Sequence, residues 1–383
     1  MDRTVKAIIL TTAGIVSAAV LVLAVAATVW HDEIRCIASV HGVGDNPYLY
    51  EMDYTAPYDL DALVEADIDG NRALVEYVLR KVAKGLPVSL PPSEREGTVT
   101  VPVEHCTSFQ APTPDGQWIF GRNYDFAKNP VLVLHSHPDG AYASVSACDL
   151  GHLGYNLDKV PDSFLHKALC IAAVYAPMDG MNEKGLSTSI MALPRQPARQ
   201  SNGRHIVGTS ILMRLWLDRC ATVEEALELL STVDVRHDVA AGSGYHYMVA
   251  DASGDCAVVE FDPEDGWKTM VTQKSPGTKT LHVTNHLIAR KYHTTEPDPA
   301  RGNIHSHSWW RYNMVQAYFA GHDDGTLTPA QALECLDLVH WKDLVWDNGT
   351  VEDTQYSAVY NLSGLSLSLS PWNRYGTVYE FGI

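Results

Sequence analysis

The sequence predicts an α+β protein in which antiparallel sheets carry helices on their outer faces. Strand patterns come in pairs around short turns, and helical patterns stand in blocks between those pairs. With 383 residues and 46% hydrophobic content, the chain is long enough to bury a large core. We therefore expect one large domain or two small ones, built from β-hairpins with helices packed outside.

The first 35 residues are expected to form a membrane anchor or a signal segment. An uncharged run covers residues 7–30, and Arg3 and Lys6 precede it. Its length suffices to cross a bilayer and exceeds the apolar region of an ordinary signal peptide, which favours an uncleaved anchor. Ala24-Val25-Ala26 also fits a cleavage site, so a cleaved signal stays open. In both cases the rest of the chain is expected to be exported.

Residues 36–105 contain a helix, a loop and a strand in the prediction. Asn71 is expected to cap the helix, whose apolar residues fall on one face. Prolines and a glycine between positions 87 and 97 predict the loop. Alternating polar and apolar residues over 98–103 indicate a strand that runs into Cys106.

The remainder of the chain alternates between hairpins and helices. Capping sequences mark helix starts at Thr222 and Thr328, and a helical pattern covers 206–219. Strand patterns occur at 185–193, 245–250, 256–261, 355–362 and 365–370, and the last four form two hairpins around Asp-Ala-Ser-Gly and Asn-Leu-Ser-Gly. These hairpins are the basis for predicting antiparallel sheets.

One predicted hairpin, which begins at Cys106, carries the clearest chemical signal. Its strands flank Pro-Thr-Pro-Asp-Gly, a strong turn sequence. A two-residue turn places Cys106 opposite Asp125, and a longer loop places it opposite Asn123, so Asp125 shares the face of Cys106 in both. Arg122 is expected on the other face unless the strand bulges. A thiol near a cation and a base-orienting carboxylate suggests a thiol amidase whose cysteine becomes a chain terminus.

Six motifs follow one another from Cys106 to near the C-terminus. They are Cys-Thr-Ser from Cys106, Phe-Gly-Arg-Asn-Tyr-Asp from Phe120, Asp-Gly-Met-Asn-Glu-Lys-Gly-Leu from Asp179, Val-Thr-Asn from Val283, Ser-Trp-Trp-Arg-Tyr from Ser308 and Gln-Tyr-Ser-Ala-Val-Tyr from Gln355. In these motifs and their order, the chain resembles the choloylglycine hydrolase and acid ceramidase group of N-terminal-nucleophile (Ntn) amidases. The resemblance implies a four-layer αββα sandwich. The chain is therefore expected to consist of the signal-anchor or transmembrane segment at 1–35, which the uncharged run predicts, a pro-segment at 36–105 and an Ntn-hydrolase domain at 106–383.

The resemblance further implies that the chain is cut between His105 and Cys106. The cut would free the α-amino group of Cys106, whose reference pKa of about 7.7–8.0 suits a base near neutral pH. Asp125 corresponds to the carboxylate that binds this amino group, and Arg122 to the guanidinium beside the thiol. Without the resemblance, an arginine and an aspartate three positions apart would suggest a surface ion pair.

Two further residues complete the implied site. Asn285 corresponds to the asparagine that donates to the oxyanion, and Arg311 to an arginine that braces the site; Arg301 is the competing choice. Ser308 is expected to cap the helix that carries Arg311. One position departs from the family, because Ala192 stands where bile salt hydrolases carry an asparagine. A backbone N–H at Ala192 is the candidate replacement, and the change weakens a bile-salt substrate in particular.

The composition argues against several other functions. A formal net charge of −18 argues against binding to nucleic acid or to anionic lipid surfaces. Seven cysteines without a CxxC pair indicate neither a zinc site nor a dense disulfide framework. The His-x-His pairs at 135–137 and 305–307 lack further ligands at a recognisable spacing, so we expect no metal and no cofactor.

The predicted function is an exported thiol amidase, membrane-anchored or secreted, that hydrolyses linear amide C–N bonds through a Cys106 thioester after autoproteolysis. Expected substrates are small amides with an apolar acyl group: N-acyl amines, N-acyl amino acids, or penicillin V-like and bile-salt-like compounds. The membrane is an expected partner through the N-terminal segment, and a homo-oligomer stays open. Two alternatives are an acyltransferase, in which an amine replaces water, and a catalytically dead membrane-anchored binding protein on the same scaffold.

Overall fold

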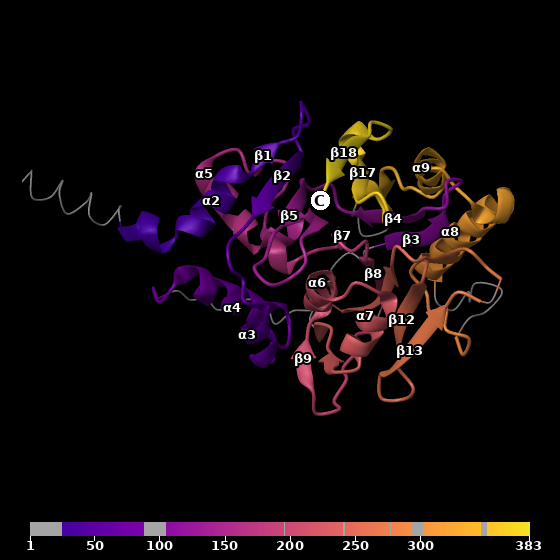
Figure 1. Cartoon of the computed structure of the whole chain (residues 1–383), viewed down its shortest axis with the longest axis horizontal. Helices are drawn as coiled ribbons and strands as arrows, with labels where there is room; N and C mark the ends of the chain where they lie inside the picture. Colours follow the sequence, from indigo (N-terminus) through magenta and orange to yellow (C-terminus); the bar gives the residue numbers. More distant parts are fainter. Residues whose placement is uncertain are drawn as a thin grey trace, which may run out of the picture.

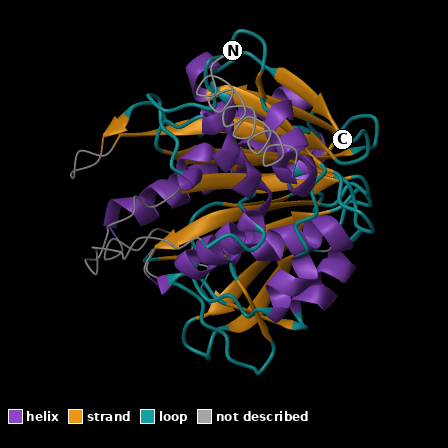
Figure 2. Ribbon diagram, turned by 90° about the vertical axis from the view of Figure 1, so that its left-hand side faces the viewer, coloured by secondary structure: helices purple, strands orange, loops and turns teal. Residues whose placement is uncertain are grey.

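The computed structural model describes residues 25–87, 105–194, 196–239, 242–275, 277–292, 302–345 and 351–383. Its strands form two large sheets that stack face to face, and helices cover the outer face of each (Figures 1 and 2). This helix–sheet–sheet–helix order confirms the predicted α+β sandwich. The prediction of purely antiparallel sheets is wrong, because β2 (Leu49–Tyr54) runs parallel to β5 (Val131–Ser136).

The larger sheet has nine strands in the order β1-β2-β5-β6-β7-β8-β11-β12-β13. Its other members are β1 (His41–Gly42), β6 (Ser144–Asp149), β7 (Asp179–Asn182), β8 (Ser187–Pro194), β11 (Ser243–Ala250), β12 (Cys256–Asp262) and β13 (Lys268–Gln273). Helices α2 (His31–Ser39), α6 (Thr209–Arg219) and α7 (Val223–Leu230) pack against it. Because β1 and β2 belong to residues 36–105, the predicted pro-segment supplies one edge of this sheet.

The N-terminal region differs from the prediction at one helix cap. Helix α4 (Asn71–Ala83) follows α3 (Leu60–Glu65), and its N-cap is Gly70 rather than Asn71. The N–H of Asn71 donates to the Asp238 carboxylate at 2.8 Å, which replaces a side-chain cap from within the helix. In the part of the chain that the structure covers, no helix is long and apolar enough to cross a membrane. The uncharged run at 7–30 lies largely outside the described residues, as does the strand predicted at 98–103.

The smaller sheet has seven strands and carries the predicted nucleophile. Its order is β14-β3-β4-β16-β17-β18, with β15 paired to β16. The strands are β3 (His105–Pro112), β4 (Trp118–Phe126), β14 (Leu281–Val283), β15 (Leu344–Val345), β16 (Val351–Asn361), β17 (Ser366–Pro371) and β18 (Tyr379–Gly382). Helices α8 (Gly302–Ala320) and α9 (Pro329–Leu338) cover its outer face around Phe109 and Val315. The main core fills the space between the two sheets.

Several local predictions are confirmed. The two hairpins form as β11–β12 and β16–β17, and Thr328 makes a complete capping box with Gln331 at the start of α9. Thr222 accepts from the N–H of Glu225 at the start of α7. The remaining short elements are η1 (Leu150–Leu153), α5 (Phe164–Lys167), η2 (Ala168–Tyr175), β9 (His205–Val207), β10 (Val233–Val235), η5 (Asp323–Gly325) and η6 (Trp372–Arg374).

The register of the β3–β4 hairpin corrects the sequence-based geometry. Cys106 pairs with Tyr124, and neither predicted register occurs. The reason is a three-residue loop, Pro114 to Gly116, which Gly116 closes with a φ of +81°. With this register Cys106 and Arg122 share the inner face of the sheet, toward the nine-stranded sheet. Asp125 points to the outer face, so the predicted faces of Arg122 and Asp125 were both wrong.

Candidate active site

The inner face of the β3–β4 hairpin places a guanidinium beside the Cys106 thiol. Both residues are fully buried. Arg122 Nε lies 3.3 Å from Asp179 Oδ2, on β7 of the other sheet, and Tyr356 and Tyr360 of β16 donate to the same carboxylate. Burial opposes the charge of Arg122, but the Cys106 sulfur and Asp179 favour it, and the net effect raises the pKa of Arg122. The thiol therefore faces a fixed cation, which favours a thiolate.

Two side chains hold the backbone of Cys106. Its N–H donates to Asn285 Oδ1 at 2.7 Å, and its carbonyl accepts from Arg311 Nη1. Arg311 Nη2 also donates to Asn285 Oδ1 at 2.7 Å, and Nη1 donates to Thr107 Oγ1 at 3.0 Å. Burial lowers the pKa of Arg311, although Asp125 and Cys106 favour its charge. The structure thus brings Asn285 and Arg311 together at Cys106, as the resemblance of the motifs predicted.

Asn285 and Ala192, the two candidate oxyanion donors, are in direct contact. Asn285 Nδ2 donates to the carbonyl oxygen of Ala192 at 2.8 Å. Ala192 lies in β8 opposite Tyr245 of β11, and both Asn285 and Ala192 are buried. In the intact chain the asparagine amide therefore binds Cys106 N through its oxygen and Ala192 through its nitrogen.

Asp125, on the outer face, has one satisfied oxygen and one open oxygen. Thr354 donates to Oδ1 at 2.6 Å, and Arg311 Nη1 lies 3.7 Å from Oδ2. Among the described residues, Oδ2 has no hydrogen-bond partner and is inaccessible to solvent. Burial raises the pKa of Asp125 to about 6, although Arg311 and Thr354 oppose the rise. A buried carboxylate oxygen without a donor is costly, so this position suits a group that can donate to it.

His105, immediately before Cys106, occupies a buried slot on the same outer face. Its Nδ1 lies 3.0 Å from Glu352 Oε2, and its ring packs on Trp341 with the centroids 4.2 Å apart. Burial, with help from Arg311, holds the pKa of His105 well below its usual range. The ring is therefore neutral and donates from Nδ1 to the carboxylate. These contacts therefore fix the side chain of His105, the residue that supplies the carbonyl of the 105–106 peptide bond.

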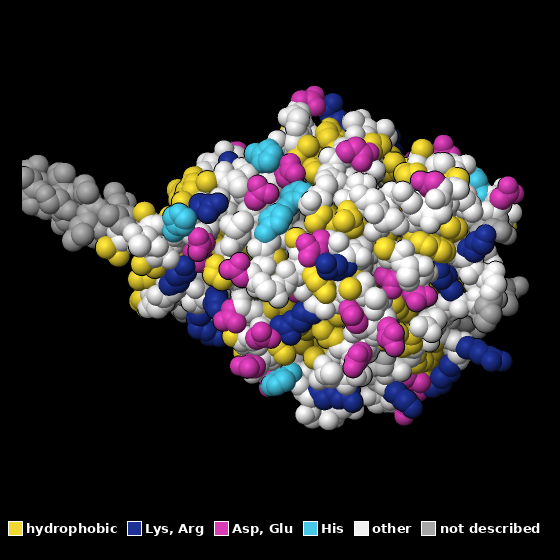
Figure 3. Space-filling view, viewed as in Figure 1, with side chains coloured by type: hydrophobic (Ala, Val, Ile, Leu, Met, Phe, Trp, Pro, Cys, Tyr) yellow, Lys and Arg dark blue, Asp and Glu magenta, His cyan; other side chains and the backbone are white. Residues whose placement is uncertain are grey.

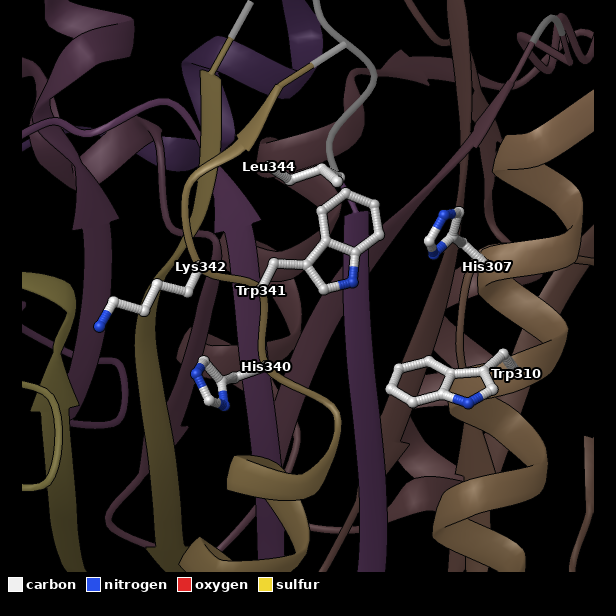
Figure 4. Close-up of a pocket in the computed structure, with 6 residues that line it drawn as sticks. All are labelled: His307, Trp310, His340, Trp341, Lys342 and Leu344. Atoms are coloured by element: carbon white, nitrogen blue, oxygen red, sulfur yellow. The ribbon is translucent and has the colours of Figure 1, made fainter.

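A cavity of about 490 Å³ adjoins this slot. It is lined by His307, Trp310, His340, Trp341, Lys342 and Leu344. His307 and Trp310 extend from α8 toward Trp341 on the segment after α9, whereas Lys342 points away from them (Figure 4). Trp341 is shared between the cavity and the His105 slot. The volume falls in the range of small-molecule sites.

Other sequence-based expectations have mixed outcomes. Ser308 lies within α8 rather than at its start, so it is no cap; its hydroxyl instead accepts from the N–H of Asn285 at 2.8 Å. Arg301 lies outside the described residues. Asp179, Tyr356 and Tyr360 lie within the motifs but had no predicted role, and Glu352 and Trp341 were not predicted as site residues. No pattern in the sequence around Glu352 marks it as a partner of His105.

The cysteines and potential metal ligands were also located. All seven cysteines are buried, and none forms a disulfide. No group of three or more His, Cys, Asp or Glu that could hold a metal ion occurs within the described ranges.

Acidic, basic and hydrophobic side chains are interspersed on the face shown in Figure 3.

The sequence matches the family model of acyl-coenzyme A:6-aminopenicillanic acid acyl-transferase over residues 112–368. The chain belongs to this family. The match begins six residues after Cys106 and includes Arg122, Asp125, Asn285 and Arg311. Membership confirms the resemblance to Ntn hydrolases on which the sequence analysis relied.

The chain is also similar to solved structures. A variant of conjugated bile acid hydrolase from Clostridium perfringens is 15% identical with a TM-score of 0.50, over 72% of this chain and 92% of that chain. Penicillin V acylase from Agrobacterium tumefaciens is 16% identical with a TM-score of 0.46, over 73% and 86%. None of the curated proteins matches the sequence. The first likeness supports an Ntn-hydrolase fold for the family member described here.

Proposed function

We propose that this chain is a thiol amidase that cuts itself between His105 and Cys106 and then hydrolyses linear amide bonds through a Cys106 thioester. The observation that carries the proposal is the convergence of Arg122, Asn285 and Arg311 on Cys106, next to a carboxylate with an open oxygen. Family membership and the Ntn fold support it.

Maturation would begin at the peptide bond between His105 and Cys106. The Cys106 sulfur attacks the carbonyl carbon of His105, the C–N bond breaks, and the nitrogen of Cys106 takes up a proton. Water then hydrolyses the resulting thioester, which leaves a carboxylate on His105 and a free thiol on Cys106. Arg122 favours the attacking thiolate, and Glu352 fixes the side chain on the acyl side of the bond.

The new α-amino group would then serve as the base for the substrate reaction. Its reference pKa of about 7.7–8.0 allows it to take the proton of the thiol and deliver it to the leaving amine. Asp125 Oδ2, near the end of β4 and opposite His105, offers an acceptor for this amino group. Asn285 and the backbone of Ala192 lie together beside Cys106, where the oxyanion of the tetrahedral intermediate would form.

The proposed substrates are small amides with an apolar acyl part. N-acyl amines, N-acyl amino acids and penicillin V-like compounds are the favoured classes, and bile-salt-like amides come after them because Ala192 has no side-chain donor. The cavity beside the His105 slot has two tryptophans, Trp310 and Trp341, which suits an apolar group. A second candidate function is acyl transfer, in which an amine replaces water at the thioester; the description of the matched family favours it.

The test is to purify the full chain and a Cys106→Ala variant, and to measure intact masses, the new N-terminus and turnover. We expect the parent chain to yield a fragment that begins at Cys106 and to hydrolyse at least one amide in a panel of penicillin V, an N-acylethanolamine, an N-acyl amino acid and glycocholate. We expect Cys106→Ala to stay uncut and inactive, and Cys106→Ser to retain some cutting. A fully active uncut chain, or unchanged turnover in Cys106→Ala, would refute the proposal.

Two variations of this test separate the alternatives. Added amine acceptors would give acylated amine rather than free acid if acyl transfer is the function. A chain that stays uncut and inactive would instead indicate a binding protein on the same scaffold. We also propose that residues 1–35 direct export; recovery of the active enzyme in the cytoplasmic fraction would contradict that part.

A further inference from the structure

One peptide group beside the candidate site is held at both of its ends. The carbonyl oxygen of Thr284 accepts from His246 Nε2 at 2.6 Å, and the N–H of Asn285 donates to Ser308 Oγ at 2.8 Å. These two atoms belong to the same planar peptide unit, so the two hydrogen bonds fix its orientation. The direction in which the Asn285 side chain leaves the backbone is fixed with it.

His246 is itself held by a buried carboxylate. Its Nδ1 lies 3.1 Å from Glu260 Oε1, and both side chains are fully buried. Tyr247 pairs with Val259 across the antiparallel strands β11 and β12, which puts His246, one residue before Tyr247, opposite Glu260, one residue after Val259. Both ring nitrogens of His246 face acceptors, a carbonyl and a carboxylate. These two contacts fix the orientation of the ring.

Glu260 also holds the chain that follows Asn285. Its Oε1 accepts from the N–H of Ile288 at 2.8 Å, and its Oε2 accepts from the N–H of Ala289 at 2.6 Å. The pair His246–Glu260 therefore anchors the segment both before and after Asn285. Its strands, β11 and β12, belong to the nine-stranded sheet, whereas this segment follows β14 of the seven-stranded sheet. The pair thus fixes Asn285 relative to the other sheet, which also carries Ala192.

Helix α8 holds the same segment from the opposite side. Besides Asn285, the Ser308 hydroxyl contacts Thr284 Oγ1 at 2.8 Å and His286 Nδ1 at 2.7 Å. Three residues further along α8, Arg311 binds the Asn285 side chain. Asn285 is thus held through its backbone by His246 and Ser308, and through its side chain by Arg311.

We propose that His246, oriented by Glu260, is a positioning residue that sets the Asn285 amide for catalysis; this rests on the proposed function. Among the described residues, the hydrogen-bond partners of His246 are Glu260 and the Thr284 carbonyl, so it acts on Asn285 and not on Cys106 itself. A donor for an oxyanion acts only when it is placed within a narrow geometry, and a misplacement of about 1 Å can cost roughly 10²-fold in rate.

The decisive experiment is a double-mutant cycle between His246→Leu and Asn285→Ala in the full chain. Turnover is measured with the panel amide that the parent hydrolyses fastest, per molecule of enzyme with a Cys106 N-terminus. Alone, His246→Leu is expected to lower kcat by roughly 10- to 100-fold with little change in KM. In the Asn285→Ala background it should cause no further loss, because the residue it positions is already gone. His246→Gln, which can keep a donor toward Thr284, should recover part of kcat.

A matched control is His237→Leu. His237 is another fully buried histidine, next to β11, whose Nδ1 accepts from the N–H of Ala198 at 3.0 Å. Its loss should leave kcat of the folded enzyme unchanged in both backgrounds. Where His246→Leu fails to fold, His246→Gln and Glu260→Gln enter the same cycle in its place.

The outcomes separate this inference from the proposed function. Equal losses from the His246 variant in the presence and absence of Asn285 would overturn the positioning role, as would an unchanged kcat or a loss confined to KM. A parent chain that is neither cut nor active on any panel amide would instead overturn the proposed function itself.

Discussion

At each face of the β3–β4 hairpin one buried arginine lies next to one buried aspartate, and the two carboxylates differ in how fully they are bonded. On the inner face Asp179 accepts from Arg122 and from two tyrosines, so both of its oxygens have donors. On the outer face Asp125 accepts from Thr354 through one oxygen, and Arg311 stays 3.7 Å from the other.

The difference indicates different tasks. A carboxylate whose oxygens are all bonded in the intact chain holds its arginine in place and has nothing more to bind. A buried carboxylate with an open oxygen is poorly satisfied until a further donor arrives. The amino group that cleavage would create at Cys106 is such a donor. We therefore expect Asp179 to stabilise the fold by holding Arg122 beside the thiol, and Asp125 to act in catalysis.

The largest effect should come from breaking the inner pair. Asp179→Asn leaves the guanidinium of Arg122 buried without a counter-charge, so we expect the free energy of unfolding to fall by roughly 3–5 kcal/mol. Urea denaturation at pH 7 measures it, with Asp125→Asn as the matched variant on the outer face. Equal stability of Asp179→Asn and the parent chain would remove the structural role assigned to the inner pair.

Asp125→Asn tests the catalytic role of the outer pair. Among molecules that are cut, we expect turnover to fall by roughly 10²-fold, because the α-amino base loses the charged group that orients it. The measurement is kcat per Cys106 N-terminus, determined by N-terminal sequencing. If this variant keeps full turnover while Asp179→Asn loses stability, the amino-group role of Asp125 is wrong.

The intact chain should also show the titration of Asp125. Its pKa is raised from 3.8 to about 6, so the protonated form is favoured in the folded chain. The associated stability is fully present below about pH 4 and is lost as the pH rises through 6, by about 2–3 kcal/mol. Denaturation of uncut Cys106→Ala between pH 4 and 7 measures this loss. Adding Asp125→Asn should flatten that part of the profile; an identical profile in both chains would contradict the assignment.

The smallest expected effect concerns His105, which lies on the outer face and is joined to Cys106 only in the uncut chain. Glu352→Gln replaces a charged acceptor of the His105 ring by a neutral one, so cutting should slow by roughly 5- to 10-fold, from a loss of about 1 kcal/mol. The time course of cutting on a gel measures this. Turnover of molecules already cut should not change. Glu334→Gln, at an exposed position of α9, is the control. Equally slowed cutting in that variant would show that the effect of Glu352→Gln does not come from its contact with His105.

The sequence predicted the residues of the site better than their geometry. The ordered motifs identified Cys106, Arg122, Asn285 and Arg311, which the fold does bring together. The faces of the hairpin depended on one loop residue, because Gly116 in a left-handed conformation makes the loop odd in length and moves the register by one. Side chains alternate between faces with period two, so that single step exchanged Arg122 and Asp125.

Partners from distant strands could not be predicted. Asp179 meets Arg122 only because β7 of the nine-stranded sheet faces β4, and Glu352 meets His105 only because β16 lies in the same sheet as β3. Their own surroundings in the sequence carry no sign of it. The same holds for His246 and Glu260, which read in the sequence as two polar residues of an ordinary hairpin. Ser308 looked like a helix cap because the start of α8 was placed too late.

The parallel pairing of β2 with β5 has a consequence for the state of the enzyme after cutting. A cut at Cys106 would break the chain but not this sheet, so the two pieces would remain one particle joined by backbone hydrogen bonds and buried side chains. Any tether in residues 1–35 would then retain the catalytic piece without a covalent link to it. Separation would require stripping an edge from a nine-stranded sheet, and a denatured enzyme would have to reassemble from two chains, at a rate that depends on their concentration.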